Sequence, residues 1–191
     1  MADSTIDLNR VVVAAVAGDS TALNTVLSEV RPLIWRYCRS RIGRPDRSAV
    51  SVDDVAQEIL MAVVKAIPSY ENVGRPFLAF VYGIARNKVA DAHRAATRNR
   101  ADPVETLPDT LEVGDGPEAI LMADEQSKRM AELLAVLPAK QREIIRLRIV
   151  LGLSAEDTAA AVGSTAGAVR VAQHRALNKL RGHPLLRQLT E

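Results

Sequence analysis

Residues 137–181 read LPAKQREIIRLRIVLGLSAEDTAAAVGSTAGAVRVAQHRALNKLR, and this segment carries the start and stop signals of two short helices joined by a tight turn. The hydroxyl of Ser154 can accept a hydrogen bond from a free helix N–H group, and Asp157 falls in the first turn near the positive helix end. The alanine-rich run that follows favours a helix, and Gly163 suits the left-handed conformation that ends one. We therefore predict a helix over 155–162.

A second helix is expected directly after this turn, with Ser164 as its N-cap. Its apolar residues recur at steps of three and four and form a narrow stripe that can pack, namely Val169, Ala172, Ala176 and Leu180. Ala159 and Ala160 are small enough to let the two helices approach closely. Two helices joined by about three residues that include a glycine are typical of the helix-turn-helix, a motif that binds DNA.

The chain from residue 164 onward is basic, with five Lys and Arg residues and a single acid, Glu191. Such a face suits phosphate, so we interpret the second helix as a recognition helix whose first turns enter the major groove while later basic residues hold the backbone. The residues assigned to this surface are Ser164, Thr165, Gly167, Arg170, Val171, His174, Arg175 and Lys179. The alternative is a solvated basic face on an ordinary helical pair.

The composition of the 191-residue chain favours an all-α protein with well-filled cores. Hydrophobic residues make up 48% of the chain, aromatic residues only 3%, and few segments alternate with period two. The net charge of +2 is close to neutral, so a nucleic-acid surface has to come from local segregation of charge. The length fits one large or two small helical domains.

Several classes of protein are excluded by what the sequence lacks. The lone cysteine, Cys38, cannot form an internal disulfide, no apolar run is long enough for a membrane helix, and residues 1–10 lack the layout of a signal peptide. We therefore expect a cytoplasmic protein. Metal-ligand spacings, glycine-rich phosphate loops and nucleophile-base pairs are absent, so we expect no enzyme, no cofactor and no small-molecule substrate.

The beginning of the chain predicts two helices and a loop. The first helix is closed by Gly18, and the second is capped by Asp19 or Ser20. Pro32 is expected to kink the second helix, because proline lacks an N–H group and crowds the preceding turn. A polar loop is predicted over 39–50.

Residues 51–67, SVDDVAQEILMAVVKAI, predict a helix with two different faces. Ser51 caps the helix, and apolar residues at helical spacing fall on its core side. The opposite side is polar and acidic and contains Asp54, Gln57, Glu58, Met61 and Lys65. This face suits a basic partner helix, and the alternative is that it is simply solvated.

A further helix is predicted from Pro76, which suits a first helical position, to about Arg98. Half of the chain's six aromatic residues lie between Phe77 and Tyr82. Polar and charged residues follow them on the same helix, among them Asn87, Lys88, Asp91 and Arg94. Aromatic rings beside basic groups suit single-stranded nucleic acid, where stacking contributes about 1–3 kcal/mol per base. The alternative is an amphipathic helix with a core aromatic cluster.

Residues 101–118, ADPVETLPDTLEVGDGPE, carry six acids, three prolines and two glycines without a basic residue. Such a segment buries little, so we predict an extended acidic linker over 101–117 between domains at 1–100 and 118–191. One interpretation is a plain tether. The other is that its charge imitates nucleic acid and occupies a basic channel.

With these segments in this order, the chain resembles sigma factors of the extracytoplasmic-function group, the smallest members of the sigma-70 family. DDVAQEILMAVVKAIPSYE (53–71) is similar to the family's core-polymerase-binding helix, and FLAFVYGIARNKVADAHR (77–94) to its promoter-melting helix. Residues 137–170 are similar to its C-terminal promoter reader. The segments RPFLAFVYGIA and VGSTAGAVRVAQHRAL are most similar to the actinobacterial sigma D type.

The resemblance implies a two-domain promoter-recognition subunit of bacterial RNA polymerase. Docking on the clamp helices of the beta-prime subunit would fall to Asp54, Gln57, Glu58 and Met61. Melting of the minus-ten element would fall to Tyr70, Asn72, Phe80, Asn87, Lys88, Asp91 and Arg94. The C-terminal domain would contact the beta flap and read the minus-thirty-five element. Family members are commonly held inactive by an anti-sigma factor, often at the membrane, so such a factor is also an expected partner.

The sequence departs from the family pattern at four positions. Val171 and Ala172 stand where many relatives carry serine and arginine, Gln173 where leucine is frequent, and Phe80 where tryptophan is frequent. Two other functions stay open, namely a homodimeric regulator that senses a ligand and an adaptor that uses the acidic face of 51–67. The absence of an alternating strand-helix receiver pattern argues against the regulator, and the basic C-terminal helix argues against the adaptor.

Overall fold

The computed structural model describes residues 7–42, 50–71, 74, 76–101, 130 and 132–184. Within these residues the chain forms helices and no strand, which confirms the all-α prediction for the described part. The elements are α1 (Leu8–Val16), α2 (Ser20–Ile42), α3 (Val52–Ala66), the 3-10 turn η2 (Ile67–Ser69), α4 (Phe77–Ala101), α6 (Ala139–Ile145), the π-helical turn η3 (Arg146–Val150), α7 (Ala155–Val162) and α8 (Ala166–Arg181). None of the described helices is both long and apolar enough to cross a bilayer.

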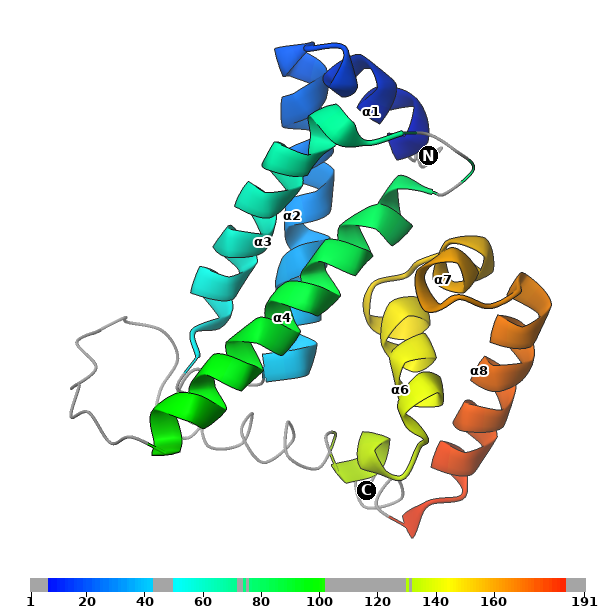
Figure 1. The fold of residues 1–191 in the computed structure, drawn as a ribbon. Helices are drawn as coiled ribbons and strands as arrows, with labels where there is room; N and C mark the ends of the chain where they lie inside the picture. Colours follow the sequence, from blue (N-terminus) through cyan, green and yellow to red (C-terminus); the bar gives the residue numbers. More distant parts are fainter. Residues whose placement is uncertain are drawn as a thin grey trace, which may run out of the picture.

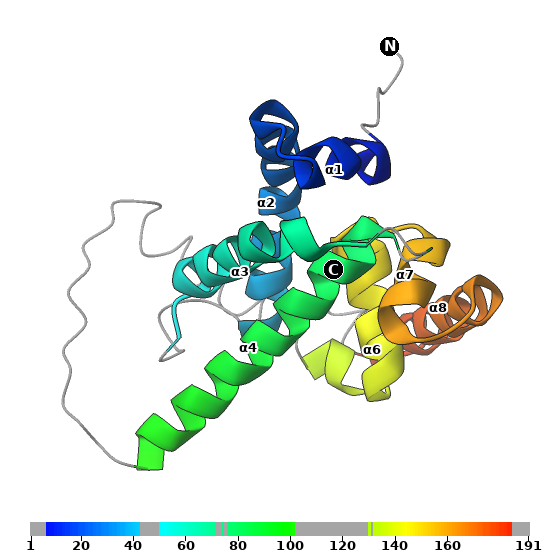
Figure 2. The ribbon, with the colours of Figure 1, turned by 45° about the horizontal axis from the view of Figure 1, so that its top comes forward.

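The elements gather into two modules (Figure 1). The N-terminal module is the described chain from 7 to 101, in which α2 packs against α1, α3 and α4. In Figure 2, α1 lies across the N-terminal end of α2. The C-terminal module is the described chain from 130 to 184, in which α8 packs against α6 and α7. The core of the N-terminal module is made of fully buried side chains that include Val12, Val26, Val30, Ile59, Val63, Phe77 and Val89.

The second helix is longer than the sequence predicts. It continues through Pro32, and residues 39–42 are helical, so the predicted loop is wrong for these residues. Buried Tyr37 and Cys38 hold this last part of α2 on the core. Arg39 and Arg41 in the last turn also stabilise the helix, because their positive charges lie near the negative end of the helix dipole. Residues 43–49 lie outside the described residues.

Side-chain caps fix where the N-terminal helices begin. The carboxylate of Asp19, and not the hydroxyl of Ser20, caps α2 by accepting two backbone N–H groups at 2.8 Å and 3.0 Å. Ser51 caps α3 as predicted. The start of α4 is capped from another helix, because the side-chain oxygen of Asn9 on α1 accepts the N–H of Phe77 at 2.8 Å. This last contact ties the first helix to the fourth.

The C-terminal module contains the predicted helix-turn-helix. The hydroxyl of Ser154 accepts the N–H of Asp157 at 2.9 Å, and Gly163 has φ 61° and ψ 58°. The first helix of the pair therefore begins and ends where predicted. On the second helix, Val169 and Ala176 are fully buried, which confirms the predicted apolar stripe.

The predicted cap of α8 is wrong by one residue. Thr165, and not Ser164, has the extended conformation of a cap, and its hydroxyl accepts the N–H of Ala168 at 3.2 Å. The N–H of Ser164 still donates to the carbonyl of Ala159 at 2.9 Å, so Ser164 belongs to the turn that closes α7. The cap consequently falls on the next residue.

The two modules share one continuous apolar core. The largest cluster of buried side chains extends from the N-terminal module to Leu147, Leu151 and Leu153 of the C-terminal module. Two smaller clusters lie entirely within the C-terminal module. The modules are therefore packed together and not merely connected by the chain.

Ser154→Ala is expected to destabilise the C-terminal module by about 1 kcal/mol, because α7 loses the hydroxyl that accepts one of its free N–H groups, that of Asp157. Urea unfolding followed by circular dichroism measures the change. Ser28→Ala is the matched control, because that hydroxyl donates to a carbonyl within α2 and caps nothing. The control is expected to change stability by less than about 0.5 kcal/mol. Equal losses for the two variants would contradict the capping role of Ser154.

Candidate functional site

The predicted acidic face of α3 is open to solvent. Asp54, Gln57 and Glu58 are exposed, and Met61 is 53% exposed. Gln57 and Met61 line a groove between α2 and α3 whose other wall includes Trp35. Carboxylates beside exposed apolar side chains are suited to an amphipathic helix that carries basic residues.

The indole of Trp35 is a member of this surface that the sequence pattern does not indicate. Its N–H donates to the carboxylate of Asp53 at 2.9 Å, and the guanidinium of Arg39 lies 5.1 Å from the ring centroid. These contacts hold the ring in place while 38% of the residue stays exposed. Aromatic residues presented in this way are enriched at protein interfaces.

The predicted polar residues of α4 lie on its outer side. Asn87, Asp91 and Arg94 are exposed, and Lys88 is half-buried. The ammonium of Lys88 lies 3.5 Å from the carboxylate of Glu58 on α3, and Arg94 pairs with Asp91 within α4. Ion pairs at exposed sites are weak, so an anionic partner can replace the carboxylate of Glu58 at Lys88 or that of Asp91 at Arg94.

The aromatic residues at the start of α4 are mostly core. Tyr70 is 7% exposed, and its ring centroid lies 5.2 Å from that of Phe77 and 5.1 Å from that of Phe80. Phe80 is half-buried, so it is the ring of this cluster that a base can reach first. A base can stack on Tyr70 only after the loop that carries it moves. Asn72 lies outside the described residues.

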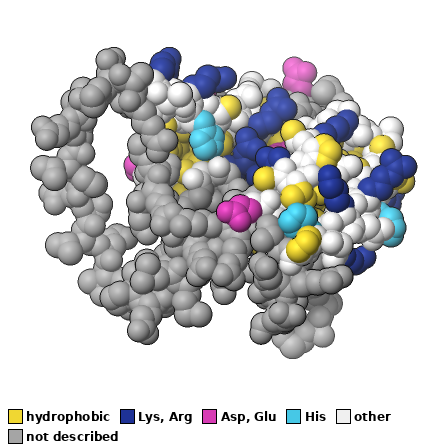
Figure 3. Space-filling model, turned by 90° about the horizontal axis from the view of Figure 1, so that it is seen from below, with side chains coloured by type: hydrophobic (Ala, Val, Ile, Leu, Met, Phe, Trp, Pro, Cys, Tyr) yellow, Lys and Arg dark blue, Asp and Glu magenta, His cyan; other side chains and the backbone are white. Residues whose placement is uncertain are grey.

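The helix α8 presents most of its predicted recognition residues to solvent. Ser164 is half-buried, and the other seven are exposed, namely Thr165, Gly167, Arg170, Val171, His174, Arg175 and Lys179. Lys and Arg side chains outnumber Asp and Glu on the described part of the face that Figure 3 shows. The exposed residues of α8 therefore include three of the predicted basic contacts, Arg170, Arg175 and Lys179.

Two basic residues of α8 have partners from other parts of the C-terminal module. Arg170 donates to the carboxylate of Glu156 on α7 at 2.6 Å, and Lys179 donates to the carbonyl of Val136 at 2.8 Å. A hydrogen bond from its own backbone N–H, followed by that from Arg170, holds the pKa of Glu156 below its ordinary value. Glu156 is a residue of this surface that the sequence does not indicate, because an acid in a first helical turn is explained by the helix dipole alone.

Family models match both modules. Residues 26–99 match sigma-70 region 2, and residues 127–180 match sigma-70 region 4. The chain belongs to the sigma-70 family. We refer below to the two matched segments as region 2 and region 4. The stand-alone regulator and the adaptor are set aside, because neither accounts for both regions in one chain.

Similar sigma-70 proteins are small sigma factors of the extracytoplasmic-function (ECF) type. The ECF RNA polymerase sigma factor SigD of Mycobacterium tuberculosis is 60% identical over 174 residues, which cover 91% of this chain and 82% of that protein. ShbA of Streptomyces griseus is 45% identical over 183 residues, which cover 94% and 96%. Among solved structures, the sigma factor RpoE of Bartonella quintana in complex with the anti-sigma factor NepR has 26% identity and a TM-score of 0.58, covering 86% of this chain and 96% of that one. These likenesses confirm the ECF resemblance.

Region 2 and region 4 of this sigma factor meet at the carboxylate of Glu143 on α6. One oxygen accepts the hydroxyl of Tyr37 at 3.1 Å and that of Tyr82 at 2.7 Å. The other accepts Arg41 at 3.4 Å and Arg146 at 3.1 Å. Burial is the largest cause that raises the pKa of both tyrosines above their ordinary value, so both hydroxyls remain donors at pH values where an exposed tyrosine ionises.

The raised tyrosine pKa values predict a loss of stability at alkaline pH. The two tyrosine hydroxyls have a higher pKa in the folded protein than in the unfolded chain, where it is near 10. Above about pH 10 the unfolded chain therefore loses these protons first, so the stability that the hydroxyls contribute below pH 10 is lost as the pH rises. The variant Tyr37→Phe/Tyr82→Phe lacks both groups, so the wild type's advantage over it should shrink between about pH 9 and pH 11. Urea unfolding at each pH measures the difference. A difference that stays constant would contradict the burial of the two hydroxyls.

Proposed function

We propose that this chain is a promoter-recognition subunit of bacterial RNA polymerase, in which region 2 docks on the core enzyme and melts the minus-ten element while region 4 reads the minus-thirty-five element. The proposal is carried by the presence of both sigma-70 regions in one chain, with most predicted binding side chains on the outer faces of packed helices. The same proposal places the protein in the cytoplasm, without a cofactor or small-molecule substrate, and assigns it no enzymatic reaction.

Docking on the core enzyme is assigned to α3 and the neighbouring groove. Asp54, Gln57 and Glu58 supply hydrogen-bond acceptors for basic side chains of the beta-prime clamp helices. Met61 and Trp35 supply exposed apolar surface beside them. An apolar centre next to charged groups is the usual arrangement of a protein interface, where the apolar contact gives affinity and the charges give orientation.

Met61→Ala and Asp54→Ala are each expected to weaken binding to core polymerase about tenfold, because each removes a contact from the centre or rim of this interface. Fluorescence anisotropy of the labelled chain, titrated with mycobacterial core enzyme, measures the affinity. Glu29→Ala is the matched control, since Glu29 is an exposed acid on α2 that does not line the groove. Equal affinities for all three variants would place the docking face elsewhere.

Melting of the minus-ten element is assigned to α4 and the loop before it. Extruding a base from the stack costs a few kcal/mol, which stacking on a ring and contacts in a pocket can offset without nucleotide hydrolysis. Phe80 is the accessible ring, and the charged side of α4 follows the strand. The proposed contacts are Tyr70, Asn72, Phe80, Asn87, Lys88, Asp91 and Arg94.

Readout of the minus-thirty-five element is assigned to the first turns of α8. The ion pair with Glu156 restricts the position of the Arg170 guanidinium. The guanidinium has five N–H groups, so those that do not bind Glu156 can donate to a guanine edge. Val171 is 50% exposed and suits the methyl group of thymine. Arg175 and Lys179 lie further along α8 and suit phosphates.

Arg170→Ala and Lys179→Ala are expected to behave differently. Arg170→Ala removes the proposed bidentate contact to guanine, so it should cost about 1–3 kcal/mol at one base pair and weaken the preference for guanine at that position. Loss of a phosphate contact should weaken all sequences alike and reduce the salt slope by about 0.9. Transcription by the reconstituted holoenzyme from promoters with single substitutions in the minus-thirty-five element, at several salt concentrations, separates the two. Uniform losses for both variants would refute the assignment of Arg170.

An anti-sigma factor is the remaining proposed partner. The similar sigma factor RpoE was solved in complex with one. A protein that binds region 2 and region 4 together would cover both polymerase-binding faces, the one on α3 and the one that contacts the beta flap. Its release, and not a ligand of the chain itself, would then start transcription.

A further inference from the structure

The first turn of α4 has no polar side chain that could cap it. Pro76, the residue before α4, carries no side-chain acceptor, and the four residues that follow, FLAF, are all apolar. The carbonyl of Pro76 accepts the N–H groups of Ala79 and Phe80 at 3.0 Å and 3.3 Å. The first N–H groups of a helix have no acceptor within the helix, so the N–H of Phe77 needs one from another part of the chain.

Asn9 of α1 supplies this acceptor. Its side-chain oxygen accepts the N–H of Phe77 at 2.8 Å, although the two residues are 68 positions apart in the sequence. Asn9 is an exposed residue, whereas Phe77 is fully buried, so water is a poor replacement for the acceptor. Loss of a helix cap typically shifts the equilibrium at a helix start by about fivefold. Asn9 therefore helps to fix where α4 begins.

The helix α1 contacts both segments that carry the nearby aromatic rings. It packs against α4 and against η2, the turn directly before Tyr70. Val12 and Ala15 anchor α1, because both are buried in the largest apolar core. Residues 8–16 precede the segment that matches region 2, which begins at residue 26. The helix α1 thus supports region 2 from outside the matched segment.

Three aromatic rings meet where α1 contacts these segments. We call Tyr70, Phe77 and Phe80 the ring cluster. The ring centroid of Tyr70 lies 5.2 Å from that of Phe77 and 5.1 Å from that of Phe80, and the two phenylalanine centroids are 6.1 Å apart. Tyr70 and Phe77 are buried, whereas Phe80 is half-buried. The position of the accessible ring consequently depends on that of Phe77, whose N–H is held by Asn9.

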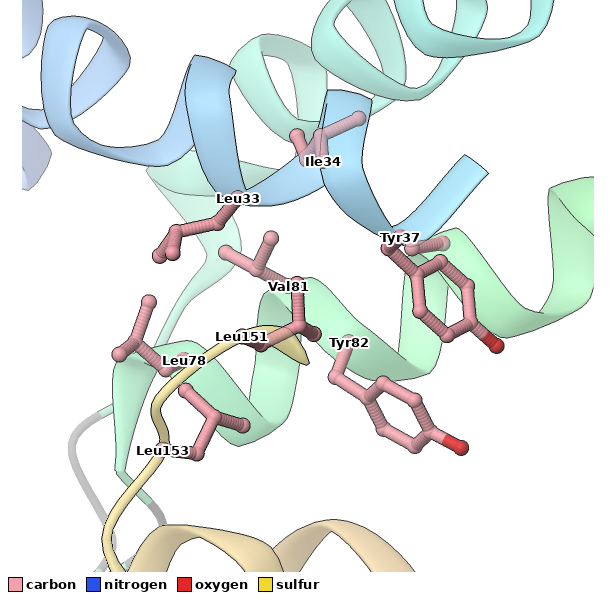
Figure 4. Close-up of a pocket in the computed structure, with 9 residues that line it drawn as sticks. Leu33, Ile34, Tyr37, Leu78, Val81, Tyr82, Leu151 and Leu153 are labelled. Atoms are coloured by element: carbon pink, nitrogen blue, oxygen red, sulfur yellow. The ribbon is translucent and has the colours of Figure 1, made fainter. Parts of the chain in front are cut away.

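Apolar packing alone does not fix the start of α4. Leu78 and Val81 of α4 line an apolar pocket together with Leu33 of α2 (Figure 4). Apolar contacts are non-directional, so they tolerate small shifts of a helix along its axis. A hydrogen bond weakens steeply when its distance or angle changes. The contact of Asn9 with Phe77 therefore supplies the directional constraint.

We infer that Asn9 is a positioning residue for minus-ten recognition, which holds the ring cluster in place through the N–H of Phe77. The role rests on the proposed function, because it requires that an extruded base stacks on Phe80. Stacking offsets part of the cost of extruding a base, and a displaced ring offsets less of it. In this role Asn9 itself contacts neither DNA nor polymerase.

Binding of a single-stranded minus-ten oligonucleotide by the reconstituted holoenzyme tests this role. The probe is the dye-labelled non-template strand of a promoter on which the wild-type holoenzyme initiates, and fluorescence anisotropy measures its affinity. Asn9→Leu keeps a side chain of similar size and removes the acceptor, whereas Asn9→Asp keeps an acceptor oxygen. Val13→Ala is the matched control, because Val13 lies on the same helix, is 54% exposed and caps no helix with its side chain.

Asn9→Leu is expected to weaken binding of the probe by about threefold to fivefold, which approaches the effect of losing one helix cap. Asn9→Asp and Val13→Ala should stay within about twofold of the wild type, and so should the affinity of all three variants for core polymerase. Wild-type affinity of Asn9→Leu for the probe would overturn the inference. Equal weakening by Asn9→Leu and Asn9→Asp, or a parallel loss of core-polymerase affinity in Asn9→Leu, would also overturn it.

A double variant tests whether Asn9 acts through the accessible ring. Phe80→Leu keeps an apolar side chain and removes the ring. In that background, Asn9→Leu is expected to change probe binding by less than about twofold, because the two substitutions then remove the same contact to the base. A further loss as large as in the wild-type background would contradict action through Phe80. Circular dichroism of each variant confirms that the helices remain folded.

The same measurements separate this role from the proposed function. A wild-type holoenzyme that neither initiates on any promoter fragment nor binds a minus-ten strand would overturn the proposed function, and the role of Asn9 with it. A wild-type holoenzyme that binds the probe, together with an Asn9→Leu holoenzyme that binds it equally well, would retain the proposed function and overturn only the role of Asn9.

Discussion

The carboxylate of Glu143 constrains the whole arrangement of this sigma factor. A largely buried negative charge is tolerated only where donors surround it, and here the donors come from α2, α4 and η3. Its position therefore relates three helical elements that are far apart in the sequence. The leucines of the shared apolar core provide apolar contact but little direction, whereas the two tyrosine hydroxyls and two guanidinium groups at Glu143 allow few alternative dockings.

The surfaces proposed for binding occupy helix faces that this packing leaves free. The core uses one stripe each of α3, α4 and α8, and the opposite stripes carry the proposed contacts to polymerase and DNA. Two of these surfaces touch, because Lys88 of the minus-ten surface pairs with Glu58 of the docking face. A polymerase side chain that binds Glu58 would release Lys88 for a phosphate. The proposed docking and melting surfaces therefore share one exposed ion pair, although its weakness limits the coupling energy.

Much of the fold follows from local sequence signals, because caps, glycines and apolar spacing act over a few residues. The start of α7 at Ser154 and its end at Gly163 are predicted for this reason. The cap of α8 is misplaced because Ser164 and Thr165 are chemically alike, and only the closing turn of α7 decides between them. The role of Glu143 is invisible in the sequence, since three of its four partners lie 61 to 106 residues away. Glu156 and Trp35 are missed because their partners, Arg170 and Asp53, lie on other helices, 14 and 18 residues away. The exposed faces of α3 and α8, in contrast, follow directly from helical period.

Run-off transcription with purified core polymerase over genomic fragments tests most directly whether the chain directs promoter-specific initiation. We expect transcripts with discrete start sites that are present only when this chain is added, and start sites that share sequence elements near minus ten and minus thirty-five. Failure of the chain to associate with the core enzyme, or the same transcripts with and without the chain, would contradict this role.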